Sequence, residues 1–82
     1  MPGRLRALSG HAVASILADF GFARVGQTGS HLKLRRTGPM GERQTLVIPL
    51  HGELAPGTLR AIFRQASRYV PQDELRPRFF TE

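Results

Sequence analysis

Two stretches of the chain repeat apolar residues at the spacing of an amphipathic helix. The first covers Ser9–Phe20, and the second begins near Pro56 and runs to about Tyr69. Ser9 is suited to cap the first helix, and Pro56 is a residue type favoured in a first helical turn. The apolar positions recur at i, i+3, i+4 and i+7, as Val13, Ile16, Leu17 and Phe20 in the first helix and Leu59, Ile62, Phe63 and Ala66 in the second.

The end of the first helix has a signal of its own. Gly21 follows the apolar run directly, where a left-handed backbone is needed, and glycine adopts that backbone without steric cost. Phe22 is then in position to fold back on Leu17, as in a Schellman motif. The pattern therefore predicts a sharp turn after the first helix.

Between the helices, the apolar pattern changes from a helical period to the alternation of strands. Three strands are predicted, over Ala23–Gln27, Ser30–Arg36 and Thr45–Leu50. The pair Thr28-Gly29 is turn-prone, and Thr37–Glu42, with a Gly-Pro pair and a second glycine, has the composition of a hairpin loop. The order of elements is therefore helix, three strands, helix.

The alternation in the last two strands predicts how they pair. Side chains that face each other across a hairpin lie on one side of the sheet, so the two apolar rows must meet. Leu34 then pairs with Leu46, and Leu32 pairs with Ile48. Both apolar rows point inward in this register.

The same register gathers polar residues on the outer face. Lys33 falls opposite Val47, and His31 falls opposite Pro49. His51 is then diagonal to His31, roughly 7–8 Å away between backbones, within reach of a shared substrate group. Two histidines on this face are therefore candidates for one site.

Two amphipathic helices on one face of a three-stranded antiparallel sheet, in the order α-β-β-β-α, outline an α+β fold like that of double-stranded-RNA-binding domains. The 82 residues suffice for one domain, with its core over about residues 9–70. Met1–Leu8 and Arg76–Glu82 are expected to be the least ordered segments, and Asp73–Phe80 to form a short final turn. The Phe79-Phe80 pair either packs back on the domain or awaits a partner.

The charge balance points to a polyanionic partner. Twelve Lys and Arg residues against six Asp and Glu residues give a net charge of +6, which attracts nucleic acid first. The chain has no cysteine, which excludes disulfides and thiol catalysis, and with only three histidines we expect neither a metal nor another cofactor. No apolar run approaches the length of a membrane span, so we expect a cytoplasmic protein without a membrane partner.

Four short motifs occur in the order and spacing of one toxin family, and the resemblance covers about Ser9 to Ala66. They are Gly21-Phe22, Gly29-Ser30-His31, Pro49-Leu50-His51-Gly52 and Pro56-Gly57-Thr58-Leu59-Arg60-Ala61-Ile62. In this combination the chain resembles the HicA-like mRNA interferase toxins of type II toxin–antitoxin systems. The resemblance implies an endoribonuclease that cleaves mRNA without a metal, arrests growth and is neutralised by a HicB-type antitoxin. It also implies that His31, in the Gly-Ser-His motif, is catalytic.

The residue types around His31 suit RNA cleavage on chemical grounds too. RNA carries its own nucleophile, the 2′-hydroxyl, and needs a base that works near neutral pH and cations that stabilise the phosphorane. His31 is the predicted base, and Lys33 and Arg35 are the predicted phosphate clamp. Gly29 lets the backbone approach the phosphate, and Ser30 can donate a hydrogen bond to it or orient the imidazole.

The sequence leaves the roles of other basic residues open. His51 is either the acid that protonates the leaving group or a strand-end residue that bonds a loop carbonyl. Arg60, Arg64 and Arg68 form one stripe on the second helix, which binds RNA, docks an acidic antitoxin or is simply solvated. His11 is expected to be solvated and inert.

Two function classes remain in view. The first is the metal-independent endoribonuclease, with mRNA and a HicB-like antitoxin with an acidic docking surface as partners. The second is a non-catalytic RNA-binding module of the same fold, which reads duplex shape through basic residues. Such a module has no need of Gly-Ser-His on a strand, and it more often has basic residues where this chain has Leu54-Ala55-Pro56-Gly57. A DNA-binding domain is disfavoured, because neither helix forms a helix-turn-helix pair. The sequence favours the nuclease.

Overall fold

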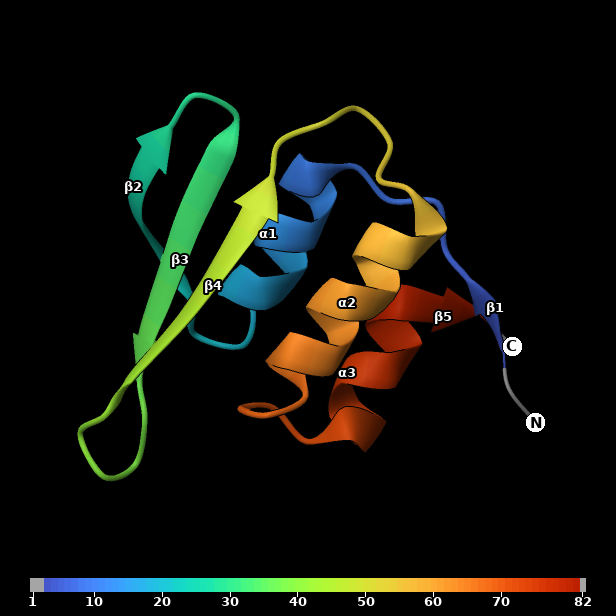
Figure 1. The fold of residues 1–82 in the computed structure, drawn as a ribbon. Coiled ribbons are helices and arrows are strands. Elements are labelled where there is room, and N and C mark those ends of the chain that lie inside the picture. The colour runs from blue at the N-terminus through green and yellow to red at the C-terminus, as the bar shows by residue number, and fades with distance from the viewer. Residues whose placement is uncertain (1–2, 82) are drawn as a thin grey trace.

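The computed structural model of the protein describes residues 3–81 and contains three helices and two small sheets. The strands β2, β3 and β4 form an antiparallel sheet in that order, and α1 and α2 cover one of its faces (Figure 1). This confirms the predicted α+β fold. In chain order the elements are β1 (Arg4–Leu5), α1 (Gly10–Ala18), β2 (Ala23–Thr28), β3 (His31–Thr37), β4 (Arg43–Pro49), α2 (Pro56–Ala66), α3 (Gln72–Phe79) and β5 (Phe80–Thr81).

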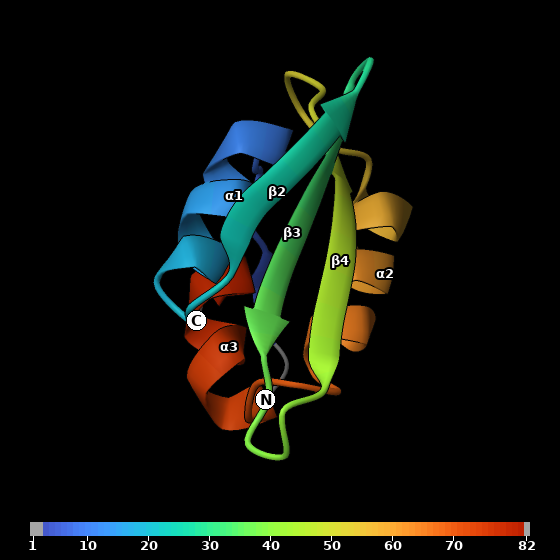
Figure 2. The same ribbon diagram turned by 90° about the vertical axis from the view of Figure 1, so that its left-hand side faces the viewer.

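The second face of the three-stranded sheet is not covered by any element within residues 3–81. Figure 2 views the molecule from this side, with the three strands in front and the helices behind them. We call it the open face. α3 lies beside α2 and below α1, and the paired strands β1 and β5 lie beyond the helices, away from the sheet (Figures 1 and 2). The core therefore lies between the sheet and the helices, and any site on the open face is reached directly from solvent.

The predicted ends of α1 are confirmed. The Ser9 hydroxyl accepts a hydrogen bond from the Ala12 N–H at 3.0 Å. After the helix, Gly21 has a φ of 95°, and the Phe22 N–H donates to the Leu17 carbonyl at 3.1 Å. This last bond is the long bond of a Schellman motif, and it directs the chain back toward the sheet.

The predicted register of β3 and β4 is also confirmed. Leu34 pairs with Leu46 and Leu32 pairs with Ile48, and all four side chains are buried under the helices. Because alternate residues face opposite sides of a strand, this burial turns the residues between them toward the open face. The strands thus present one apolar face and one polar face, as the alternation predicted.

Gly10, the first residue of α1, packs directly against the backbone at the end of β4. Its N–H donates to the His51 carbonyl at 2.9 Å, and a Cβ at this position would overlap the Pro49 carbonyl oxygen and lie 2.8 Å from the Leu50 Cα. Since these obstacles are backbone atoms, they cannot rotate away. Pro49 is directly opposite His31 in the sheet, so this contact lies next to the first residue of β3.

We therefore expect Gly10→Ala to lower the free energy of unfolding by about 1–3 kcal/mol, since an added methyl group overpacks this contact. Gly57→Ala is the matched control. Gly57 is an exposed glycine of α2 with no atom within 4 Å of an added Cβ, so alanine should be neutral or stabilise by up to about 1 kcal/mol. Urea unfolding of both variants measures this, and equal midpoints would contradict the prediction.

Arg36 joins the sheet to the ends of two helices. Its Nε donates to Gln44 Oε1 at 2.7 Å, its Nη1 donates to the Phe20 carbonyl at 2.8 Å, and its Nη2 donates to the Tyr69 carbonyl. The guanidinium carbon is 5.0 Å from the centroid of the Phe22 ring. Arg36 thus satisfies backbone carbonyls that follow α1 and α2 and would otherwise lack a partner. The apolar pattern of the sequence does not predict this role for Arg36.

The loop between β3 and β4, residues 38–42, is held by Glu42. The carboxylate accepts hydrogen bonds from the Met40 N–H and from the Gln44 side-chain amide, both at 3.0 Å. Hydrogen bonds from its own backbone N–H and from the Gln44 amide lower the pKa of Glu42 below the ordinary value of 4.5. This carboxylate is therefore engaged within its own hairpin.

The C-terminal part of the chain differs from the prediction. Where a short turn was expected over Asp73–Phe80, Gln72–Phe79 form the helix α3. Leu75 and Phe79 are four residues apart and share one face of this helix. Both are fully buried, so this is the face that packs on the core. Two apolar residues are too few to establish a helical period, and Pro77 interrupts the pattern, so the apolar pattern does not predict this helix.

Both terminal segments also contain a strand, although they were expected to be the least ordered parts. Arg4 pairs with Thr81 and Leu5 pairs with Phe80. The Phe63 ring lies 5.5 Å from the Phe79 ring and 5.2 Å from the Phe80 ring, between centroids. The Phe79-Phe80 pair therefore packs back on the protein. The remaining residues of these segments, 1–2 and 82, lie outside the described part of the chain.

Candidate functional site

A two-residue turn positions His31. Thr28 pairs with His31, which leaves Gly29 and Ser30 as the turn between β2 and β3. Gly29 has a φ of 58° and Ser30 does not have a positive φ, the combination found in a type II′ turn. The Gln27 side chain braces the turn by donating to the Gly29 carbonyl at 2.9 Å. The Gly-Ser-His motif is therefore a tight turn that ends on the first residue of β3.

The structure assigns Gly29 and Ser30 to holding this turn. Gly29 is required by its positive φ, which other residue types rarely adopt. The Ser30 carbonyl accepts a hydrogen bond from the Leu50 N–H at 2.6 Å, and so ties the turn to the segment after β4. Neither residue lines the hollow beside His31. Their direct contact with substrate stays a prediction.

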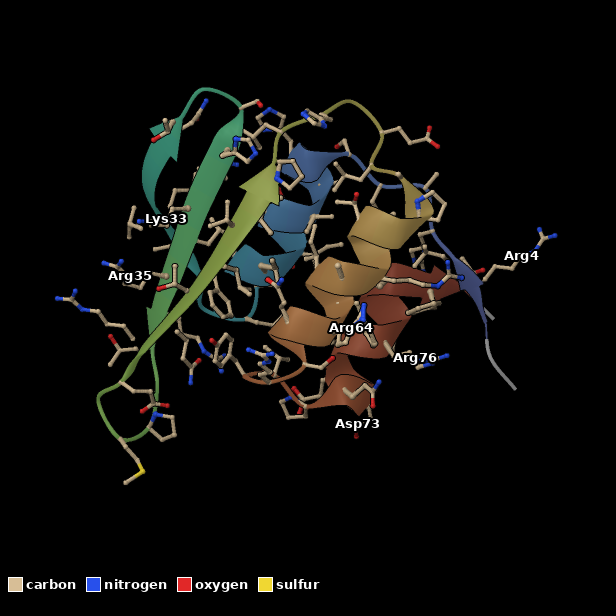
Figure 3. All side chains as sticks on the ribbon, in the orientation of Figure 1. Arg4, Lys33, Arg35, Arg64, Asp73 and Arg76 are labelled. Carbon is tan, nitrogen blue, oxygen red and sulfur yellow. The ribbon has the colours of Figure 1, made fainter. Side chains whose placement is uncertain are left out.

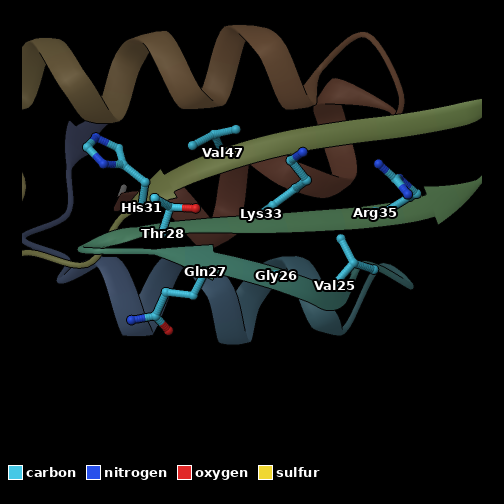
Figure 4. Close-up of a pocket in the computed structure, with 8 residues that line it drawn as sticks. All are labelled: Val25, Gly26, Gln27, Thr28, His31, Lys33, Arg35 and Val47. Atoms are coloured by element: carbon cyan, nitrogen blue, oxygen red, sulfur yellow. The ribbon is translucent and has the colours of Figure 1, made fainter.

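His31 lies in a hollow of about 320 Å³ on the open face. Figure 4 shows His31, Lys33 and Arg35 one after another along β3, with side chains on the same side of the strand. The structure thus brings together the three residues that the alternation placed on one face. None of the residues that line the hollow is acidic; they are Val25, Gly26, Gln27, Thr28, His31, Lys33, Arg35 and Val47.

A β-bulge in β2 shapes the middle of the hollow. Arg24 pairs with Leu34 and Gly26 pairs with Lys33, so Val25 is an extra residue without a partner. Gly26 does not have a positive φ, and an added Cβ would meet no atom within 4 Å. Neither backbone nor packing requires glycine here, and its missing side chain leaves the space beside Lys33 open. Gly26 and the bulge were not predicted, although a glycine inside a predicted strand is a known signal for a bulge.

Two valines flank the cations of the hollow. Val25 is 48% exposed and Val47 is 46% exposed, which is unusual for large apolar residues in this protein. Val47 is directly opposite Lys33, and the Arg35 Nε donates to the Thr45 hydroxyl at 3.4 Å. The hollow therefore offers apolar contact beside positive charge, a combination that suits a base or ribose next to its phosphate.

The structure does not join His51 to His31 through the sheet. β4 ends at Pro49, two residues before His51, so the ladder that would set the two histidines diagonally stops too early. His51 is exposed and does not line the hollow. Its backbone carbonyl accepts the hydrogen bond from the Gly10 N–H. The structure thus gives the backbone of His51 a role in linking the loop to α1.

Arg60 and Arg64 of the predicted stripe lie on α2, on a different surface from the hollow, whereas Arg68 follows the end of α2 at Ala66. Figure 3 shows Lys33 and Arg35 on the sheet side of the molecule and Arg64 on α2, which covers the opposite face of the sheet. Arg60, one turn earlier on α2, is exposed like Arg64. The structure therefore does not bring these two predicted substrate-binding residues to His31. His11 is exposed on α1, as expected.

Across residues 3–81, no cluster of three or more His, Cys, Asp or Glu side chains has the placement to hold a metal ion. In the same part of the chain, every helix is too short or too polar to cross a membrane.

Comparison with known proteins found one match. A family model described as the HicA toxin of bacterial toxin-antitoxin matches residues 10–67 of the 82 residues. The matched segment contains α1, the three-stranded sheet, α2 and every residue that lines the hollow. No curated protein and no solved structure matched the chain.

Proposed function

Because this chain belongs to the HicA toxin family of bacterial toxin–antitoxin systems, we propose that it is a metal-independent endoribonuclease that cleaves mRNA in the cytoplasm and so arrests growth. The observation that carries the proposal is the hollow on the open face. An exposed histidine lies there beside two cations, and none of the residues that line the hollow is acidic. RNA needs a base and positive charge for its own cleavage. His31, Lys33 and Arg35 provide both.

The proposed reaction uses the 2′-hydroxyl of the substrate as nucleophile. An imidazole nitrogen of His31 accepts the 2′-hydroxyl proton while the 2′-oxygen bonds to phosphorus. Lys33, the cation next to His31 along β3, and Arg35 beyond it place positive charge along the substrate backbone, and their field stabilises the negative charge that develops on the phosphorane oxygens. The bond from phosphorus to the 5′-oxygen then breaks, and the 5′-oxygen takes up a proton from water or from a second acid. The products are a 2′,3′-cyclic phosphate and a 5′-hydroxyl.

The purified chain tests this proposal on an RNA oligonucleotide in the presence of a chelator. We expect cleavage to continue, the new ends to be a 2′,3′-cyclic phosphate and a 5′-hydroxyl, and a 2′-deoxy sugar at the cleaved position to block the reaction. Loss of activity in chelator and its return with a divalent ion would contradict the mechanism. Binding of RNA without any new ends would favour the alternative, a non-catalytic RNA-binding module.

His51 remains a candidate for the acid, although the sheet does not align it with His31. If it protonates the 5′-oxygen, one neutral and one charged histidine are needed at once, and the rate passes through a maximum between about pH 5 and 8. We then expect His51→Ala to lose one limb of this profile. If His51 only holds its loop, the variant lowers stability and activity together and keeps the shape. Cleavage rates against pH for both proteins decide between these roles.

We further propose that the partner is a HicB-like antitoxin whose acidic surface covers the open face. Attraction between opposite charges speeds association, and salt screens this attraction. The complex should therefore form rapidly, and its affinity should fall as the salt concentration is raised. Bound antitoxin should also protect His31 from imidazole-modifying reagents, while exposed His11 on α1 serves as the internal control. Salt-insensitive binding that leaves His31 reactive would contradict this mode of inhibition. Arg60 and Arg64 stay candidates for RNA or antitoxin binding on their separate surface.

A further inference from the structure

Arg43 adds a third cation to the open face. It pairs with Thr37 at the end of the β3–β4 ladder, and residues directly opposite in an antiparallel pair share one side of the sheet. Its burial pattern agrees, since Arg43 is exposed and its neighbour Gln44 is buried. Within residues 3–81, no hydrogen bond or ion pair engages the Arg43 side chain. Its charge is therefore available to a ligand on the same face as His31.

His31 and the three cations follow one another along the sheet. Alternate residues of a strand lie roughly 6.6–6.8 Å apart, which is close to the length of one nucleotide in an extended chain. His31, Lys33 and Arg35 occupy three successive alternate positions of β3, and Arg43 lies beside the fourth, Thr37. A nucleic acid backbone that runs along β3 therefore meets one cation per phosphate after it leaves His31.

The end of the molecule beyond His31 offers no such charge. The chain there consists of the β2–β3 turn, the β4–α2 loop and the start of α1, which lie together at the top of Figure 1. These segments fall within residues 7–23, 25–32 and 44–59, which contain no lysine or arginine, and the β4–α2 loop carries Glu53. Glu42 is held within the loop at the opposite end. The positive charge of the open face thus lies on one side of His31.

We propose that the substrate backbone follows β3 away from His31, with successive phosphates at Lys33, Arg35 and Arg43, so that charge contacts lie on one side of the scissile phosphate only. The inference rests on the proposed function, because it places His31 at the scissile bond. It adds Arg43 as a substrate-binding residue and gives the enzyme a one-sided requirement for substrate length. Such a requirement differs from binding of RNA to a uniformly positive surface, which would treat both sides alike.

Neutral phosphate analogues test the one-sided contact. In an RNA oligonucleotide with one mapped cleavage site, a methylphosphonate linkage replaces the first, second or third phosphate on either side in turn. We expect kcat/KM to fall on the order of threefold to tenfold per neutral linkage on one side and to stay unchanged on the other. The third linkage on the sensitive side should have no further effect in Arg43→Gln. The matched control is Arg4→Gln, an exposed arginine on β1 far from β3 (Figure 3), which should keep the wild-type pattern.

Equal losses on both sides, or a wild-type pattern in Arg43→Gln, would overturn the inference while leaving the nuclease proposal standing. If the wild-type protein cleaves no RNA, the proposed function fails. A measurement of RNA binding then tests whether Arg43 contacts a phosphate. The probe is a 2′-O-methyl oligonucleotide titrated at several salt concentrations. Each phosphate contact to a single strand adds about 0.7 to the slope of log affinity against log salt. Arg43→Gln should lower the slope by about this amount and Arg4→Gln should not, whereas an unchanged slope in Arg43→Gln overturns the contact.

Discussion

Replacing His31 by alanine is expected to slow RNA cleavage by about 100-fold to 10,000-fold, the usual loss when a positioned base is removed. The protein should remain folded. His31 is exposed at the start of β3, and its side chain has no role in the core. Single-turnover cleavage rates measure the first effect, and urea unfolding of the same variant measures the second.

His11→Ala is the matched control for this experiment. His11 is also exposed but lies on α1, which covers the opposite face of the sheet. We expect this variant to cleave at the wild-type rate. If His31→Ala cleaves as fast as the wild type, His31 is not the base. If it cleaves slowly because it is unfolded, the unfolding curve reveals this directly, since its midpoint shifts relative to that of His11→Ala.

Replacing Arg36 by alanine is expected to lower the free energy of unfolding by about 2–4 kcal/mol. The guanidinium donates to the carbonyls of Phe20 and Tyr69 and to the side chain of Gln44, which is buried. Hydrogen bonds that involve a charged group stabilise by about 1.5–3 kcal/mol each, and removing the donor leaves its partners unsatisfied. Because Arg36 is half-buried, water replaces part of this loss. The midpoint of urea unfolding measures the effect.

The neighbouring residue provides the contrast for Arg36. Arg35 is adjacent in sequence but faces the open side of the sheet, where its Nε donates weakly to the Thr45 hydroxyl at 3.4 Å. We expect Arg35→Ala to change stability by no more than about 0.5 kcal/mol and to slow cleavage. Arg36→Lys should recover only part of the stability, because one ammonium cannot reach three acceptors in the geometry of a guanidinium. Equal unfolding midpoints for Arg35→Ala and Arg36→Ala would contradict the structural role of Arg36.

Much of the candidate site was predictable because it is built from consecutive strands. The alternation around Leu32 and Leu34 predicted which face of β3 is buried, and the pairing with β4 followed from the same rule. His31, Lys33 and Arg35 therefore had to share the other face. The position of His51 was not predictable in this way, because it depends on where β4 ends. Pro49 is the last residue of that strand, and proline removes a donor from the ladder.

The bulge in β2 and the hollow beside it were outside the reach of the sequence pattern. A bulge adds one residue to one strand and shows only when the partner strand is placed beside it. Val25 is that residue, and its position sets Gly26 opposite Lys33. The space beside Lys33 thus results from the pairing of β2 with β3 and from the missing side chain of Gly26. The pattern of β2 alone does not show that Gly26 lies opposite Lys33.

The sequence by itself determined the elements whose contacts join residues close together in the chain. They are the capped helix α1, the antiparallel sheet with its register, and the helix α2. Their signals are periodic, and they extend over enough residues to be distinguished from chance. Only the tertiary structure decided that β1 pairs with β5, from opposite ends of the chain, and that Arg36 reaches both Phe20 and Tyr69. The physical reason is that such contacts join short segments without a repeating pattern, and their partners become neighbours only after the core has brought distant parts of the chain together.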